Sequence, residues 1–246
     1  MGFPLSGAIK SLLTRTFFRH VRRSYSQSGE DIIISDLFNR LQIKSPRYLD
    51  IGANDPVSLN NTYRLYQRGA SGVCVEPNPI LCEKIRQKRS RDICINAGVA
   101  FDEKREADFY VFPEKFNGLN TFSKEEADFW EKEGNDEIGR HHVEKVVKMQ
   151  LLEINDLMKQ YFLPHPNLIS IDVEGFDFQI MKGIDFNRFK PEVFCIETLG
   201  FVEDNREIKK NDIIEFFVSK GYFVYADTYV NTIFCRKDSY KILKMD

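Results

Sequence analysis

The sequence has few of the residues that cross-link a fold or bind a structural metal. It contains 246 residues, of which five are cysteines and four are histidines, and no two cysteines form a C-x-x-C pair. An odd cysteine count without close pairs argues against a disulfide framework and against a structural zinc site. Most of the cysteines lie in apolar runs: Cys74, Cys94, Cys195 and Cys235. We therefore expect reduced cysteines that pack in the core of a cytoplasmic protein.

Three further absences exclude whole classes of function. The chain has 35 basic and 37 acidic residues, so its net charge of -2 excludes an overall polyanion-binding character. No apolar run approaches the roughly 18 residues that a membrane span requires. No G-x-G-x-x-G motif is present, and without that pyrophosphate cradle an NAD or FAD site is not expected.

Residues 1–23 differ from the rest of the chain because they carry basic residues and no acid. The basic residues are Lys10, Arg15, Arg19, Arg22 and Arg23, and apolar residues recur between them at helical spacing. One interpretation is a basic amphipathic helix in peripheral contact with an anionic membrane. The alternative, which we favour, is a helix that packs on the main domain or on a second subunit.

From residue 46 onward, short apolar strands alternate with helices. Strands are expected near residues 48–51, 72–75, 93–96, 168–172 and 193–197, with a closing hairpin of strands near 223–226 and 232–235. Alternation of this kind predicts a parallel sheet with helices on both faces. We therefore divide the chain into a helical extension (residues 1–45), with a helix capped by Ser28, and an α/β domain (residues 46–246) with an insert at about 113–142.

The ends of the first two strands carry residues suited to a nucleoside. Ligands of open α/β sheets bind beyond the carboxyl ends of the strands. The first strand ends in Asp50 and runs into Gly52, Ala53 and Asn54, and the second ends in Glu76 and Pro77. An acid at the end of the second strand accepts hydrogen bonds from both hydroxyls of a ribose. A single glycine without a phosphate cradle therefore predicts a nucleoside ligand that lacks a diphosphate.

The later strands end in carboxylates. Asp172 and Glu174 follow an apolar strand, and Glu197 ends the next one. Carboxylates in such positions suit holding a substrate hydroxyl, accepting a proton or binding a cation, and the alternative is an acidic helix N-terminus. Asp172 and Glu197 together could hold Mg²⁺, but no further ligand is evident, so we expect no metal. His141, in the insert, is a further candidate base.

Five motifs in order resemble the FkbM-type S-adenosylmethionine-dependent methyltransferases. The resemblance spans residues 25–235 and rests on YSQSGED (25–31), LDIGANDP (49–56), NNTY (60–63), GVCVEPNP (72–79) and IDVEGFD (171–177). It implies a class I methyltransferase fold, which is a Rossmann-like three-layer sandwich around a seven-stranded, mostly parallel sheet with an antiparallel last strand. One departure from the family pattern is Asn60, where a serine is expected.

The resemblance also implies roles for individual residues. Asp50 and the loop of Gly52, Ala53 and Asn54 would face the methionine part of S-adenosylmethionine, and Glu76 would bind its ribose. Asn96 would lie near the adenine, while Gln27 and Glu30 would close over the amino-acid end or the substrate. Pro77 and Asp172 complete the expected cofactor-binding set.

The resulting prediction is an enzyme that methylates a hydroxyl of a sugar, a glycan or a related natural product. A base would come from Asp172, Glu174, Glu197 or His141. The acceptor is then a small molecule or a saccharide and not a nucleic acid, because no broad basic surface is expected beyond residues 1–23. Alternatives are methylation of nitrogen or of a macromolecule, and a non-catalytic scaffold with the same fold. The identity of the acceptor and the oligomeric state stay open.

Overall fold

A computed structural model of the chain describes residues 22–134, 139–173, 176–201 and 207–240. The expected amphipathic helix of residues 1–23 falls almost entirely outside these ranges, so its membrane or packing role stays a prediction. None of the described helices combines the length and the apolar character that crossing a bilayer requires.

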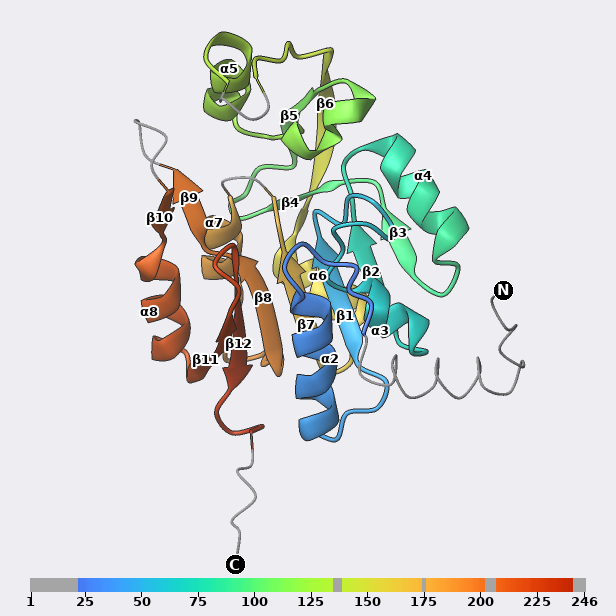
Figure 1. The fold of residues 1–246 in the computed structure, drawn as a ribbon, viewed down its shortest axis with the longest axis vertical. Helices are drawn as coiled ribbons and strands as arrows, with labels where there is room; N and C mark the ends of the chain where they lie inside the picture. Colours follow the sequence, from blue (N-terminus) through green and yellow to red (C-terminus); the bar gives the residue numbers. More distant parts are fainter. Residues whose placement is uncertain (1–21, 135–138, 174–175, 202–206, 241–246) are drawn as a thin grey trace, which may run out of the picture.

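A seven-stranded sheet forms the centre of the described part of the chain (Figure 1). Its spatial order is β11-β12-β8-β7-β1-β2-β3, and β12 is antiparallel to both of its neighbours while the other pairs are parallel. This arrangement confirms the predicted sheet and its antiparallel last strand. The strands are β1 (Arg47–Ile51), β2 (Ser71–Val75), β3 (Ile93–Ile95), β7 (Leu168–Ile171), β8 (Val193–Glu197), β11 (Tyr222–Asp227) and β12 (Asn231–Arg236).

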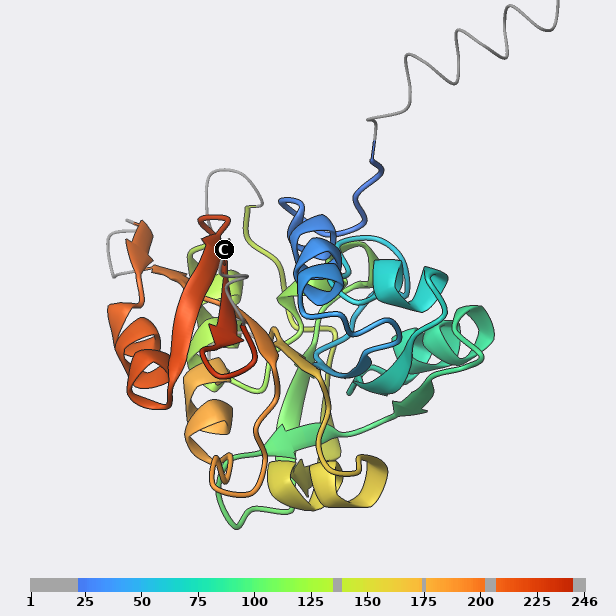
Figure 2. The same cartoon turned by 90° about the horizontal axis from the view of Figure 1, so that it is seen from below.

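Helices cover both faces of the sheet, as the view from below shows (Figure 2). One face packs against α2 (Glu30–Arg40), α3 (Tyr63–Gln67) and α4 (Pro79–Lys88). The other packs against α6 (Ile154–Tyr161), α7 (Asp177–Lys182) and α8 (Asn211–Ser219). The three-layer sandwich expected from the alternation of strands and helices is therefore present.

The pleat of β1 decides which side chains reach which layer. Successive side chains of a strand point to opposite faces. Leu49 and Ile51 belong to the core cluster on the α6–α7–α8 side, whereas Tyr48 belongs to the cluster on the α2–α3 side. Asp50 therefore points to the same side as Tyr48, away from the side that Ile51 faces.

The start of α2 differs from the predicted cap. Gly29 is the N-cap residue, with a φ of 92°, and no side chain caps the helix. Ser28 is therefore not the cap, and its main-chain N–H instead donates to a Glu30 side-chain oxygen at 2.8 Å. A left-handed residue is readily supplied by glycine, which lacks the Cβ that makes this conformation costly.

Two smaller sheets extend beyond the central one. A three-stranded sheet has the order β4-β6-β5, and β9 pairs with β10. We call β5, the 3₁₀ helix η1, α5 and β6 the cap, because they stand above the central sheet in Figure 1. The bounds of these elements are β4 (Gly98–Ala100), β5 (Glu106–Val111), η1 (Glu114–Leu119), α5 (Lys124–Lys132), β6 (Lys145–Glu153), β9 (Leu199–Phe201) and β10 (Glu207–Lys209).

The aromatic core beneath α8 gives a direct test of the packing. Phe217 has no exposed surface, and its ring stacks on that of Phe234 with centroids 4.4 Å apart. We expect Phe217→Ala to lower the free energy of unfolding by about 3–5 kcal/mol, because it removes a large buried side chain and leaves a cavity. The neighbouring Val218 is 47% exposed, and Val218→Ala should change it by less than about 0.5 kcal/mol. Equal effects of the two substitutions in urea denaturation would contradict this packing.

Candidate functional site

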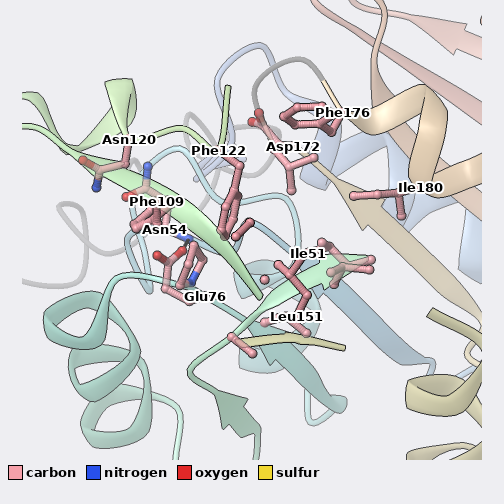
Figure 3. A pocket seen from close by; sticks show the side chains of 18 of the residues that line it. Ile51, Asn54, Glu76, Phe109, Asn120, Phe122, Leu151, Asp172, Phe176 and Ile180 are labelled. Atoms are coloured by element: carbon pink, nitrogen blue, oxygen red, sulfur yellow. Dashed lines mark hydrogen bonds between the residues drawn. The ribbon is translucent and has the colours of Figure 1, made fainter. Parts of the chain in front are cut away.

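A cavity of about 320 Å³ lies at the carboxyl ends of the parallel strands, between them and the cap (Figure 3). Its size is at the lower end of the range typical for small-molecule sites, about 300–1,000 Å³. Most of the residues lining it come from three places. The strand ends contribute Ile51, Gly52, Asn54, Val75, Glu76, Pro77 and Asp172; the segment after β3 contributes residues 97–102; and the cap contributes Phe109, Asn117, Asn120, Phe122 and Leu151.

Glu76 is the buried carboxylate of this cavity. Its side chain is 4% exposed, and each of its two oxygens accepts one main-chain hydrogen bond. The Asn54 N–H donates to one oxygen at 2.8 Å and the Asn78 N–H donates to the other at 2.7 Å. Each carboxylate oxygen can accept more than one hydrogen bond. The carboxylate is thus held rigidly while keeping capacity for two donors from a ligand.

The environment of Glu76 changes its ionisation. Burial raises the pKa of this carboxyl to about 7, although the main-chain N–H groups of Asn78 and Asn54 act in the opposite direction. Burial has this effect because it disfavours the charged form. Hydrogen-bond donors on a ligand would stabilise the ionised Glu76 carboxylate, which burial in the protein alone disfavours.

Gly52 allows the strands to approach one another at the floor of the cavity. A Cβ at this position would collide with the carbonyl oxygen of Asp172, and the φ of Gly52 is +78°. Its N–H donates to the carbonyl of Val75 at 2.9 Å. Glycine is therefore required both for the turn and for the contact between the ends of β1 and β7.

Asp172 follows β7 and faces the cavity from the side opposite Glu76 (Figure 3). Its main-chain N–H is fixed by the carbonyl of Ile51 at 3.0 Å, and its residue surface is exposed. Desolvation by the surrounding protein raises the pKa of its carboxyl to about 7, and the nearby acids Asp177 and Asp50 also act to raise it. A carboxylate with a raised pKa beside a cavity can accept a proton near neutral pH.

Glu197 ends β8, the strand next to β7, and does not line the cavity. Burial and the charge of Asp172 raise the pKa of its carboxyl as well. Since each carboxylate disfavours the ionisation of the other, the two groups hold protons more tightly than isolated acids would. Glu174 lies outside the described residues.

The other expected cofactor-binding residues divide into two groups. Gln27 lines the cavity together with Gly52, Asn54, Glu76, Pro77 and Asp172. Ala53 and Asn96 do not line it, but Asn96 fixes the turn after β2, because its amide donates to the carbonyls of Glu76 at 2.9 Å and Pro77 at 2.7 Å. Asn96 is therefore placed to position Glu76.

Glu30 and Asp50 are also absent from the lining and have structural partners instead. Glu30 accepts from the Thr228 hydroxyl at 2.6 Å, which ties the start of α2 to the loop between β11 and β12. Burial acts to raise the pKa of Glu30, but the hydrogen bonds from Thr228 and Ser28 dominate and the net pKa is lowered. The Asp50 carboxylate accepts from the Thr62 hydroxyl at 2.5 Å, on the far face of β1.

His141 is not among the lining residues. Its ring packs on that of Phe116, with centroids 3.6 Å apart, and its main-chain N–H donates to the carbonyl of Trp130 at 2.8 Å. Among the residues that the structure describes, no group of three or more histidine, cysteine, aspartate or glutamate side chains could hold a metal ion.

The sequence interpretation did not assign Phe109, Asn120 or Phe122 to the site. Phe109 and Phe122 pack together, with ring centroids 4.7 Å apart, and both line the cavity. The Asn120 side chain accepts from the Phe112 N–H at 2.8 Å. These residues reach the site through the fold of the cap, so no local motif could reveal them.

Comparison with known proteins gives one family. The family model described as the methyltransferase FkbM domain matches residues 50–224. A comparison with curated protein sequences finds no match. Among solved structures, the chain is similar to a TehB-like SAM-dependent methyltransferase from Corynebacterium glutamicum, with 11% identity, 96% of this chain and 100% of that one covered, and a TM-score of 0.43.

A second solved structure is the magnesium protoporphyrin IX methyltransferase of Synechocystis PCC 6803 with bound SAM. The identity is 8%, 94% of this chain and 92% of that one are covered, and the TM-score is 0.40. Similarity at this level carries no argument about this chain, so assignment to a family rests on the match over residues 50–224.

The raised pKa of Glu76 predicts a pH dependence of stability. Between about pH 4.5 and pH 7 the folded carboxyl keeps a proton that the unfolded chain has released. The free energy of unfolding therefore falls as pH rises through this window, by about 2–4 kcal/mol in total. Glu76→Gln removes the titration, so the stability of the wild type relative to this variant should decrease from pH 4.5 to 8 in urea denaturation. A relative stability that increases with pH would contradict the raised pKa.

Proposed function

Because this chain belongs to the FkbM methyltransferase domain family, matched over residues 50–224, we propose that it methylates a hydroxyl oxygen of a saccharide or a related natural product. Its methyl donor is S-adenosylmethionine. The observation that supports an oxygen acceptor is the position of Asp172, whose carboxyl follows a strand end, lines the cavity and has a raised pKa.

The residues of the cavity fit the methyl donor. Glu76 offers two oriented oxygens to the hydroxyls of a ribose, and the cavity needs no phosphate cradle. Apolar side chains, including Val99, Leu151 and Phe122, line the part next to the segment after β3, as an adenine ring requires. Gly52 brings bare main chain to the opposite end, where the amino-acid portion would lie.

The chemistry requires positioning and removal of one proton. S-adenosylmethionine supplies an electrophilic methyl group when bound. Asp172 would hold the acceptor hydroxyl and receive its proton as the oxygen attacks, and a well-aligned pair of reactants needs little further activation. Desolvation by the surrounding protein and the charges of Asp177 and Asp50 would raise the basicity of Asp172. His141 packs on Phe116 and is not needed for this step.

Two features support the proposed saccharide acceptor and the proposed cytoplasmic location. Phe176 lines the cavity close to Asp172 (Figure 3), and its ring stacks on that of Phe101 with centroids 5.5 Å apart, which provides an apolar wall for a sugar ring.

All five cysteines are free and buried, as expected for the reducing cytoplasm in which we propose that the enzyme acts. The cavity also argues against a non-catalytic scaffold, which has no use for an oriented carboxylate.

Cofactor binding by Glu76 is tested by calorimetry. We expect the wild type to bind S-adenosylmethionine and Glu76→Ala to bind it at least about 10-fold more weakly, because a buried charge-assisted hydrogen bond is lost. Glu83→Ala, on the exposed side of α4, is the matched control and should bind like the wild type. A wild type that does not bind would refute the enzymatic function and leave the scaffold interpretation.

The role of Asp172 is tested by kinetics with hydroxylated saccharides as acceptors. Asp172→Asn should lower kcat by about 10²–10⁴-fold, the usual contribution of a general base, and should change the affinity for S-adenosylmethionine much less. The rate of the wild type should rise with pH as the Asp172 carboxyl ionises. Asp108→Asn, which loses a surface ion pair with Lys148, is the control. A methyl group found on nitrogen in the product by NMR would contradict the proposed reaction.

A further inference from the structure

Arg89 is a charged residue with no exposed surface, at the end of α4. Its guanidinium donates to Asp92 at 2.7 Å, to the Thr62 hydroxyl at 2.8 Å and to the Asn60 side-chain oxygen at 3.2 Å. A buried charge is tolerated only when it is paired and hydrogen-bonded. The proposed reaction does not use this network, yet one of its members touches the loop that follows β1.

Asn60 connects the guanidinium to that loop. Its side-chain oxygen accepts from Arg89 and from the main-chain N–H groups of Thr62 at 3.0 Å and Tyr63 at 2.8 Å. Its amide nitrogen donates in the other direction, to the carbonyls of Ala53 at 3.0 Å and Asp55 at 3.2 Å. Because its partners on one side are donors and on the other side acceptors, the orientation of the amide is determined by its surroundings.

The loop held in this way has an unusual backbone. Gly52, Asn54 and Leu59 all have positive φ, at 78°, 47° and 53°. Such conformations in non-glycine residues cost free energy and persist where surrounding contacts enforce them. The same loop carries the Asn54 N–H that orients Glu76 and the Gly52 main chain at the floor of the cavity.

We infer that Asn60 and Arg89 are positioning residues for the methyl donor, with Asn60 transmitting the buried Arg89–Asp92 ion pair to the main chain of residues 53–55. This inference rests on the proposed function. Neither residue lines the cavity, so they act through the loop and not by contact with a ligand. The asparagine at position 60 has the length to reach both the guanidinium and the two carbonyls.

The substitution Asn60→Asp separates the contacts of the Asn60 side-chain oxygen from those of its amide nitrogen. Aspartate keeps an oxygen for Arg89, Thr62 and Tyr63, but it replaces the donor to Ala53 and Asp55 with an oxygen that repels their carbonyls. We expect a roughly 10-fold weaker binding of S-adenosylmethionine by calorimetry, because the loop that orients Glu76 loses its two hydrogen bonds from the Asn60 amide. At saturating S-adenosylmethionine, kcat should stay within about twofold, which gives a split between KM and kcat.

Asn167→Asp is the matched control at the opposite end of the sheet. The Asn167 oxygen accepts from the Arg47 N–H at 2.8 Å and its amide donates to Glu192 at 2.9 Å. The same isosteric change there should lower the melting temperature without changing the affinity for S-adenosylmethionine. Should Asn60→Asp fail to fold, Asn60→Ser takes its place, because serine cannot span both sets of partners.

The outcomes distinguish failure of the positioning role from failure of the proposed function. If the wild type binds S-adenosylmethionine and the position-60 variant binds it as tightly as Asn167→Asp does, the positioning role is refuted and the proposed function stands. If the wild type itself does not bind, the proposed function is refuted and the inference with it. A selective loss of affinity in the position-60 variant supports the inference.

Discussion

The buried positive charge of Arg89 is the constraint that connects the amino-terminal starts of β1 and β2 to the loop that follows β1. Asp92 pairs with it at 2.7 Å, and the same carboxylate accepts from the Tyr48 hydroxyl and from the main-chain N–H of Gly72 at 2.8 Å. Removing one partner from a buried pair costs about 3–5 kcal/mol, because an uncompensated charge remains. The network therefore ties β1, β2 and the segment before β3 together at one fixed spacing, behind the loop that borders the cavity.

The pleat of β1 lets this network and the ligand site occupy opposite faces of one strand. Asp50 joins the network through Thr62, while Ile51 and Gly52 face the cavity. The polar groups of the Arg89 network can thus keep their hydrogen-bond partners at all times. The cavity, in contrast, keeps carboxyl groups whose ionisation is unfavourable without a ligand. Glu76 is the clearest case, since burial raises its pKa to about 7. Under the proposed function, the two hydroxyls of a ribose would donate to the Glu76 carboxylate and so lower the free-energy cost of its ionisation.

Strand ends could be predicted from the sequence, and what covers or supports them could not. Gly52, Glu76 and Asp172 follow apolar strands. Because the carboxyl ends of parallel strands lie at the same edge of a sheet, these residues are expected to lie close together, and all three line the cavity. Phe109 belongs to the cap and reaches the site only through tertiary folding. Arg89 stands in a run of charged residues that looks like a solvated surface, because burial leaves no local signature in such a run.

We propose that the methyl donor binds on the loop after β1 and against Glu76. Hydrogen–deuterium exchange with and without S-adenosylhomocysteine, the demethylated product of the donor, tests it most directly. Amide protons that open locally exchange, and a bound ligand suppresses that opening. With S-adenosylhomocysteine bound, we expect slower amide exchange than in the free protein, confined to residues 51–61, 75–79 and 96–102 and to the part of the cap that faces them. Unchanged exchange in these segments, or protection elsewhere on the sheet, would contradict it.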